Sequence, residues 1–421
     1  MPGESFRFIH ASDFHLEEPL GDLDGVPPHL REAMVGAPHA AARAVLEAAG
    51  ADNIDFLVLS GDLLSPMAAG PHGMSLLLEG FGRLHAAGKP VFWAAGLADD
   101  PQRWPEAVPL PPNVHLFPKG RVESVPVVRA GRTICVVIGR SSEGRGALHV
   151  AGYDAETTDE FTVAVGFGST EAAALAETRF DYWALGGEHN RRELPGAAET
   201  GAIYAGSPQG RSLREFGPHG YTVVDVDAER NARLHAVECD TFRYCDVEID
   251  AAEIRQVGNL RSLLGERIGQ LQNRHGGRHL LIGWDIVVAG DESIQRVGDA
   301  DELMTALRRD FGHGTPSAWT VRLSIRPPRR YPKSWSEEDT ILGDYLRAAE
   351  KHRKSEGREL NLLPCTEEFM AEDGASAALP PSATSLLAEV PAVARPDLLD
   401  RATLLGVEML RGGKPKLVRN A

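Results

Sequence analysis

The sequence predicts an α/β fold built on a largely parallel sheet, and two observations lead to this prediction. Apolar segments at 6–9, 56–60 and 90–95 alternate with segments of helical character at 37–49 and 74–87. Alternating strands and helices are typical of parallel sheets that helices cover. Polar residues follow the carboxyl ends of these strands, which is where ligands bind in such sheets.

The first apolar segment leads into an Asp-x-His pair. Phe6, Phe8 and Ile9 predict a short strand, and Asp13 and His15 follow it. Residues two apart at a strand end point the same way, so a carboxylate and an imidazole converge there as in a metal site. Taken alone, the pair favours a turn that Asp13 caps and a surface His15, because Asp-x-His also occurs by chance.

The remaining pattern predicts three regions: a first domain at 1–240, an α+β domain at 241–330, and a linker with a helical partner-binding segment at 331–421. Further strands of the first domain are expected at 134–138, 161–165, 182–185, 202–204, 221–226 and 232–237, with a helix at 170–178. The second domain is expected to contain strands 244–249, 279–288 and 319–325 and helices 257–274 and 300–311. In the tail, the basic, proline-rich stretch 326–333 predicts a linker, 371–396 is rich in Ala, Ser and Pro, and helices are expected at 337–354 and 396–410.

Composition narrows the class of protein. The four cysteines form no CxxC pair, which favours a reducing, cytoplasmic setting. No segment reaches membrane-spanning length, so no membrane association is expected. The net charge of -16 argues against a protein that coats nucleic acid on its own, since such binding needs phosphate neutralisation.

Four motifs follow predicted strands in a fixed order: Asp13-Phe14-His15, Gly61-Asp62-Leu63, the segment 181–189 ending in Glu188-His189, and Gly-Ser-Pro-Gln-Gly-Arg at 206–211. In order and spacing they resemble the calcineurin-like metallophosphoesterases. More narrowly, the chain resembles SbcD-type DNA-repair exonucleases and their YhaO-like relatives, and the stretch 206–211 is the most specific feature. The resemblance implies a metallophosphoesterase β-sandwich flanked by helices, with a smaller α+β capping domain.

The resemblance also implies a ligand set that is complete for one metal and lost for a second. Asp13, His15, Asp62 and His189 would hold one divalent ion per chain, with Mn²⁺ suited to such oxygen and nitrogen ligands. At the second site, the family's asparagine is Leu97, its catalytic histidine is Ala98, and its two further histidines are Gly166 and Gly187. No catalytic residue is therefore assigned, because alanine cannot move a proton. Retention of Asp13, His15 and His189 for structural hydrogen bonds is the alternative.

By this resemblance the chain is expected to be a subunit of an SbcD-like DNA-repair nuclease-type complex, with an SbcC-like or YhaN-like ATPase as partner and DNA reached through the complex. The first hypothesis is a scaffold or sensor whose hydrolysis is weak or lost. The alternatives are a Mn²⁺-dependent exonuclease or phosphodiesterase that uses one metal, and hydrolysis of a small nucleotide. Whether the chain is an enzyme, and whether it forms a homodimer, stays open.

Charged residues near the motifs complete the expected site. Arg191 and Arg211, with Arg192 and Arg214, are expected either to form a phosphate-binding rim or to be ordinary surface arginines. Glu188 is either a replacement ligand or base, or a solvated loop residue.

Overall fold

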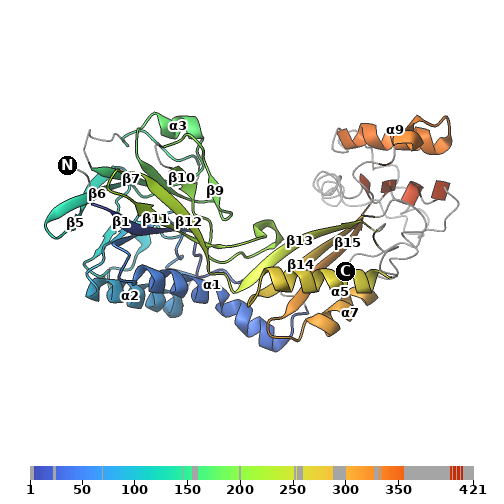
Figure 1. Cartoon of the computed structure of the whole chain (residues 1–421), viewed down its shortest axis with the longest axis horizontal. Coiled ribbons are helices and arrows are strands. Elements are labelled where there is room, and N and C mark those ends of the chain that lie inside the picture. Colours follow the sequence, from blue (N-terminus) through green and yellow to red (C-terminus); the bar gives the residue numbers. More distant parts are fainter. Residues whose placement is uncertain are drawn as a thin grey trace, which may run out of the picture. The chain divides into compact units, whose positions relative to one another are not determined.

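The computed structural model of the chain falls into two compact units (Figure 1). It describes residues 4–21, 25–68, 70–144, 146–153, 160–198, 201–250, 253, 259–287, 300–326, 331, 333–354 and 399–410, the last range without 401, 404 and 408. The first unit comprises Met1–Cys245, His275–Ile282 and Gly314–Val321, and the second comprises Asp246–Arg274, Gly283–His313 and Arg322–Ala421.

Two six-stranded sheets form the frame of the first unit. The first sheet has the order β12-β11-β1-β2-β3-β4, with β1 Phe6–Ala11, β2 Phe56–Leu59, β3 Val91–Trp93, β4 Val114–Leu116, β11 Gly220–Val226 and β12 Ala232–Glu238. Strands β1 to β4 are parallel, whereas β11 runs antiparallel to β1 and to β12. The predicted parallel sheet is therefore confirmed, with an antiparallel pair added at one edge.

The second sheet has the order β5-β6-β7-β8-β10-β9, with β5 Glu123–Arg129, β6 Arg132–Gly139, β7 Phe161–Phe167, β8 Tyr182–Gly186, β9 Arg192–Glu193 and β10 Gly201–Tyr204. Strands β6, β7, β8 and β10 are parallel, and the edge strands β5 and β9 are antiparallel to their neighbours. The carboxyl ends of the parallel strands gather at one end of each sheet, which is where the predicted ligands lie.

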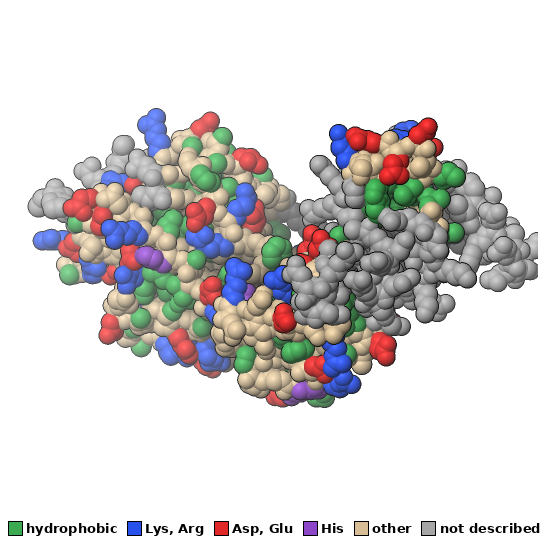
Figure 2. Space-filling model, turned by 45° about the vertical axis from the view of Figure 1, so that its right-hand side comes forward, with side chains coloured by type: hydrophobic (Ala, Val, Ile, Leu, Met, Phe, Trp, Pro, Cys, Tyr) green, Lys and Arg blue, Asp and Glu red, His purple; other side chains and the backbone are tan. Residues whose placement is uncertain are grey.

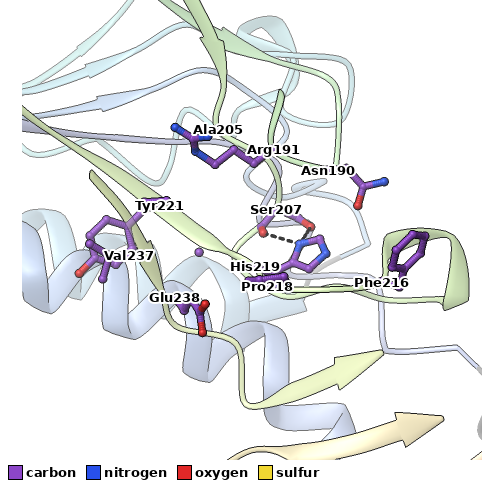
Figure 3. A pocket seen from close by; sticks show the side chains of 12 residues that line it. Asn190, Arg191, Ala205, Ser207, Phe216, Pro218, His219, Tyr221, Val237 and Glu238 are labelled. Atoms are coloured by element: carbon purple, nitrogen blue, oxygen red, sulfur yellow. Dashed lines mark hydrogen bonds between the residues drawn. The ribbon is translucent and has the colours of Figure 1, made fainter. Parts of the chain in front are cut away.

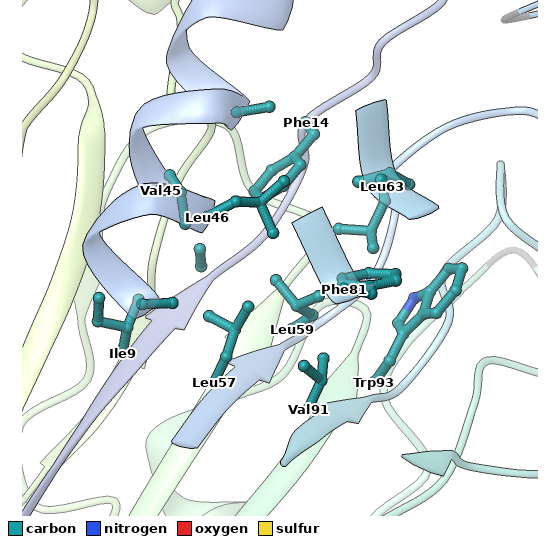
Figure 4. Packing of buried hydrophobic residues seen from close by; sticks show 14 of the residues in the cluster. Ile9, Phe14, Val45, Leu46, Leu57, Leu59, Leu63, Phe81, Val91 and Trp93 are labelled. Carbon is teal, nitrogen blue, oxygen red and sulfur yellow. The ribbon is translucent and has the colours of Figure 1, made fainter. Parts of the chain in front are cut away.

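Side-chain alternation along the strands of the first sheet builds two cores. Ile9, Leu57 and Val91 face the helices α1 Pro28–Ala49 and α2 Gly70–Ala86, and pack with Leu46 and Phe81 (Figure 4). Because side chains of a strand alternate, their neighbours face the other way. Both faces are apolar, as expected for a buried parallel sheet.

The opposite faces of these strands pack against the second sheet. Phe8 and Phe56 stack with ring centroids 4.7 Å apart, and Tyr182 of β8 meets Phe8 edge-on at 5.6 Å. This aromatic cluster joins both sheets into one sandwich. The far face of the second sheet carries a third core, which includes Trp183, Phe180 and Leu175 of the short helix α3 Ala172–Ala176. The predicted α/β sandwich flanked by helices is confirmed.

The helix expected at 37–49 begins much earlier, at Pro28. Proline suits the first turn of a helix because its missing N–H would be unpaired there. Pro38 lies inside the helix and is buried. The prediction rested on the alanine-rich residues from 37 onward, whereas burial of Leu30 and Met34 stabilises the turns before them.

A three-stranded sheet, β13-β14-β15, follows the sandwich along the chain. Its strands are β13 Phe242–Asp250, β14 His279–Val287 and β15 Ala318–Arg326, with helices α5 Leu260–Arg274 and α7 Ala300–Phe311 between them in sequence. The smaller α+β element set is thus confirmed, and the boundary between the two units runs through all three strands. The exact division into domains stays a prediction.

In place of the single helix expected at 337–354, the tail has two, α8 Lys333–Glu337 and α9 Ile341–Lys354. Tyr345 of α9 donates a hydrogen bond to the carbonyl oxygen of Ala402 at 2.6 Å, and Leu346 and Leu399 are both buried. The helical residues of 399–410 therefore pack on the chain's own tail. The expected linker residues 327–330 and 332, and the stretch 371–396, lie outside the described residues. None of the described helices is both long and apolar enough to span a membrane.

Candidate metal centre

The loops after β1 and β2 run side by side and carry three of the predicted ligands. Asp13 N donates to the carbonyl oxygen of Gly61 at 2.9 Å, and His15 N donates to that of Asp62 at 3.0 Å. Asp13, His15 and Asp62 have φ values of 55°, 44° and 52°. Non-glycine residues adopt this left-handed conformation at a cost, so the hydrogen bonds between the loops must hold it. Such strain concentrates at functional sites.

The fourth predicted ligand comes from the second sheet, through a close approach of β8 to β2. A side chain on Gly186 would collide with the carbonyl oxygen of Ser60, so glycine is required where the two sheets converge. The next residue, Gly187, donates its N–H to both carboxylate oxygens of Asp13, at 3.2 Å and 3.1 Å. The loop that continues to His189 is thereby tied to the loop after β1.

Asp13, His15 and His189 come together as one group, with ligand atoms all within 4.8 Å of one another. Asp62 adjoins them, its Oδ2 lying 3.7 Å from Nε2 of His15. Burial raises the pKa of Asp13 to about 6, against the opposing effects of Ser12 and the two histidines. Proximity of a cation would favour the ionised form.

The ring of His15 separates two sets of carboxylates. Nε2 lies 3.9 Å from Oδ1 of Asp13, while Nδ1 lies 3.6 Å and 3.7 Å from Oε1 of Glu17 and of Glu18. Burial lowers the pKa of His15, but the interaction with Glu17 and the nearby aspartates outweighs it, so the pKa lies above its usual value. Neither ring nitrogen has a hydrogen-bond partner among the described residues, although both are buried. A divalent cation at Nε2 would satisfy this nitrogen together with Asp13 and Asp62, so the donor set fits a metal.

Glu215 orients His189. Its Oε1 lies 2.8 Å from Nδ1 of His189. Burial raises the pKa of Glu215, but His189 and Arg211 favour the carboxylate more strongly and lower the pKa to about 2. An ionised carboxylate only accepts hydrogen bonds, so His189 must carry its proton on Nδ1 and present Nε2 as a ligand nitrogen. Nη2 of Arg211 lies 2.9 Å from the same Nδ1. With the proton on Nδ1, Arg211 contributes a positive charge beside Glu215.

At the expected second site, backbone amides bind the Asp62 carboxylate oxygen that a second metal would need. Leu97 N and Ala98 N both donate to Oδ1 of Asp62, at 2.5 Å and 2.7 Å. In the resembled family Asp62 would be shared between two metals. Here one of its oxygens is bound by the loop that replaces the asparagine and histidine.

The residue that faces this second site is Phe167, and the expectation that placed Gly166 there is wrong. Strand β7 ends at Phe167 rather than near residue 165. Val165 lies in the core between the sheets, and alternation places Phe167 on that same face. A side chain on Gly166 would instead meet Leu148, on the far face of the sheet.

The ring of Phe167 fills the space beside Asp62. A side-chain carbon on Gly61 would lie 2.5 Å from this ring, and one on Gly96 would lie 2.7 Å from it. Gly187, where the family has a histidine, would bring a side-chain carbon to 3.2 Å of the same ring. The space where the resemblance predicts a second metal is therefore occupied by an apolar ring.

Asp99 is a functional neighbour that the motif comparison did not single out. Its carboxylate accepts hydrogen bonds from N–H groups of Gly96 (2.6 Å), Asp62 (3.1 Å), Leu63 (3.1 Å) and Trp93 Nε1 (2.9 Å). Burial, and to a smaller extent the charge of Asp62, raises the pKa of Asp99 to about 7, although the hydrogen-bond donors act to lower it. Asp99 thus fixes the loop whose amides bind Asp62.

The predicted phosphate-binding arginines differ in their surroundings. Arg211 is only 6% exposed, and its Nη1 is buried with no hydrogen-bond partner among the described residues. Arg191 is partly buried and pairs with Glu193 at 2.8 Å. Glu188 forms an ion pair with Arg192, which supports the solvated-loop interpretation of Glu188, and Arg214 is exposed.

Sequence comparison connects this geometry to one curated protein. The chain is 25% identical over 342 residues to the uncharacterized metallophosphoesterase YhaO of Bacillus subtilis, covering 75% of this chain and 80% of that protein. This relationship supports the metallophosphoesterase family. No family model matches the chain.

The solved structures that resemble this chain include two proteins that cover about half of it. TT1561 of Thermus thermophilus is 14% identical and covers 55% of this chain and 98% of its own, with a TM-score of 0.31. A dimetal phosphatase from Danio rerio is 9% identical and covers 54% and 98%, with a TM-score of 0.33.

Replacing Asp99 by Asn tests its role in this site. Asn is similar in size but offers one acceptor oxygen, and its amide faces N–H donors, so we expect the free energy of unfolding to fall by about 1–3 kcal/mol. Denaturant unfolding of the full chain measures this loss. The exposed Asp52→Asn is the matched control and should change the value by less than about 0.5 kcal/mol. Equal stability of both variants would show that Asp99 does not hold the loop.

Proposed function

We propose that this chain is a metallophosphoesterase-family protein that binds one divalent metal and has weak or no hydrolytic activity. It would act as a scaffold or nucleic-acid sensor within an SbcD-like DNA-repair complex. One observation supports the proposal: the ring of Phe167 and the amides of Leu97 and Ala98 crowd the side of Asp62 where the resemblance predicts a second metal.

The first site has the residues for one metal. Asp13, His15 and Asp62 would bind it from one sheet, and His189, oriented by Glu215, would bind it from the other. A divalent ion there would neutralise the carboxylates and polarise a phosphate oxygen. Mn²⁺ is the ion we propose, because the set combines carboxylates with imidazoles.

The chain supplies little else for phosphoryl chemistry at this place. Ala98 stands where the family has the histidine that moves a proton, and the methyl group of an alanine cannot move one. General acid catalysis contributes about 10²–10⁴-fold, and clamping by two metals adds a further contribution. Losing both explains why we favour a binding role over a fast hydrolase.

Arg211 is the residue that we propose to contact a phosphate. Its guanidinium sits beside His189, and its buried Nη1 lacks a partner among the described residues. Buried donors are almost always satisfied, so a missing acceptor is indicated. Phosphate oxygens match the guanidinium fork well. Arg191 would assist from the loop after His189.

A one-metal exonuclease or phosphodiesterase is the second candidate function. The observation that favours it is the intact first site, where both nitrogens of the buried His15 lack hydrogen-bond partners. A purely structural histidine would be expected to have its nitrogens paired.

We also propose that the chain works with an SbcC-like or YhaN-like ATPase and reaches DNA through that complex. With a net charge of -16 the protein repels nucleic acid at long range. On the face drawn in Figure 2, acidic and basic side chains lie interspersed over the described surface. A basic partner would overcome this barrier.

The first prediction concerns metal content. We expect about one tightly bound divalent ion per chain, lost in Asp13→Ala and His15→Ala and retained in Glu193→Gln, whose side chain is 58% exposed. Elemental analysis of the purified proteins after Mn²⁺ loading measures this. Two tight ions per chain, or unchanged binding in His15→Ala, would contradict a single site at these residues.

Hydrolysis is the second quantity to measure. We expect exonuclease and phosphodiesterase activity in Mn²⁺ at least about 100-fold below that of a relative with both metal sites intact. An assay on duplex DNA ends with Asp62→Ala as the inactive reference tests this. Robust degradation that Asp62→Ala abolishes would instead establish the one-metal nuclease.

A third prediction tests the tail as the attachment to the ATPase. Ile341 and Met409 are 75% and 63% exposed although the helices around them pack on each other. We expect Ile341→Asp with Met409→Asp to abolish co-purification with the ATPase, while Val35→Asp, at a position that is 52% exposed in the sandwich unit, leaves it intact. Unchanged co-purification of the double variant would place the attachment elsewhere.

A further inference from the structure

A pocket of about 540 Å³ adjoins the loop that carries His189 (Figure 3). The residues that line it come from that loop, from the loop after β10 and from the adjoining parts of β11 and β12: Asn190, Arg191, Ala205, Ser207, Phe216, Pro218, His219, Gly220, Tyr221, Ala236, Val237 and Glu238. Strand β11 is antiparallel to β1, so its beginning lies at the carboxyl end of β1. The pocket therefore opens at the same end of the sheet as the candidate metal centre.

One wall of the pocket is aromatic and open to solvent. Phe216 is 58% exposed, and it is the only exposed Phe, Tyr or Trp side chain among the described residues. Tyr221 and Val237 add apolar surface elsewhere in the pocket. An exposed ring beside a pocket provides a surface on which a flat ligand can stack.

The polar groups of the pocket leave one cation available. Nε of Arg191 is buried without a partner among the described residues, and its Nη1 pairs only with the exposed Glu193. Exposed pairs of this kind contribute little, so an anion can compete for the guanidinium. Glu238 does not cancel this charge, because Arg243 and Arg278 bind its carboxylate at 2.8 Å and 3.2 Å.

The floor of the pocket is fixed before any ligand arrives. Nδ1 of His219 lies 2.9 Å from the carbonyl oxygen of Ser207, and Nε2 lies 2.9 Å from that of Glu215. Asn190 donates its side-chain N–H to the carbonyl oxygen of Arg214 at 3.1 Å, which leaves its own carbonyl oxygen as an acceptor. Preorganised polar groups of this kind lower the cost of binding.

We propose that this pocket binds one unstacked nucleobase of a nucleic-acid strand, with the base against Phe216 and a phosphate of the same strand at Arg191. A strand combines flat aromatic groups with anions, which are the two kinds of group that these side chains bind. A pocket of this volume is within the range of small-ligand sites. The inference rests on the proposed function, because it assumes that a strand bound at the metal centre passes beside His189.

The test compares thymidine 5′-monophosphate with 2-deoxyribose 5-phosphate, which lacks the base, by calorimetric titration of the full-length protein. Their affinity ratio isolates the base, because any contact of the phosphate with a metal cancels. We expect a ratio of about ten for the wild-type protein, about one for Phe216→Ala, and about ten or more for Phe216→Trp. Val128→Ala, at an exposed position on β5, is the matched control and should keep the ratio.

Two outcomes would overturn the inference: a ratio of one in the wild-type protein, or an unchanged ratio in Phe216→Ala. Displacement by N-acetyl-tryptophanamide without base discrimination would assign the pocket to a protein segment instead. Metal content, measured on the same samples, separates this inference from the proposed function. A ratio that persists without metal binding keeps the pocket and rejects the metal site, whereas metal binding with a ratio of one does the reverse.

Discussion

The two carboxylate oxygens of Asp62 have different partners, and the character of the site depends on this division. Oδ2 is directed to His15, whereas Oδ1 accepts two backbone hydrogen bonds from the loop at Leu97 and Ala98. Charge-assisted bonds of this kind are strong, and an oxygen that accepts two of them is a poor ligand for a further cation. The loop can approach this closely only because Gly96 has no side chain to collide with Asp62. The space beside this oxygen is therefore packed and not empty.

The same convergence of the two sheets that closes the second site also assembles the first. Gly186 lets β8 reach the carbonyl oxygen of Ser60, and the chain then passes through Gly187, which binds Asp13, to His189. The aromatic cluster between the sheets, near the amino ends of β2 and β8, holds the two sheets together. Each candidate ligand is consequently held by hydrogen bonds and packing outside the site, as preorganised centres require.

Much of this arrangement was predictable from sequence, and the failures have physical causes. Asp13 and Asp62 follow strands that end at Ala11 and Leu59, and the short apolar runs of these strands were sufficient to predict their places. The error at Gly166 arose because a shift of one residue along a strand moves a side chain to the other face, and the end of β7 was placed too early. The role of Glu215 depends on a contact between two loops, which no local pattern encodes.

The electrostatics of the site link metal binding to phosphate binding. The imidazoles are surrounded by the carboxylates of Asp13, Glu17, Asp62 and Glu215. Among the described residues, the guanidinium of Arg211 is the only one within hydrogen-bond or ion-pair distance of this group. A phosphodiester would approach this group of negative charges against repulsion, at an effective dielectric far below that of water. A bound divalent cation reverses the sign of that interaction, as ions commonly do in sites of this kind. Arg211 alone cannot do so, because its guanidinium already lies between Glu18 and Glu215. Phosphate affinity at this centre must therefore depend on metal occupancy, whether a phosphodiester is cleaved or only held.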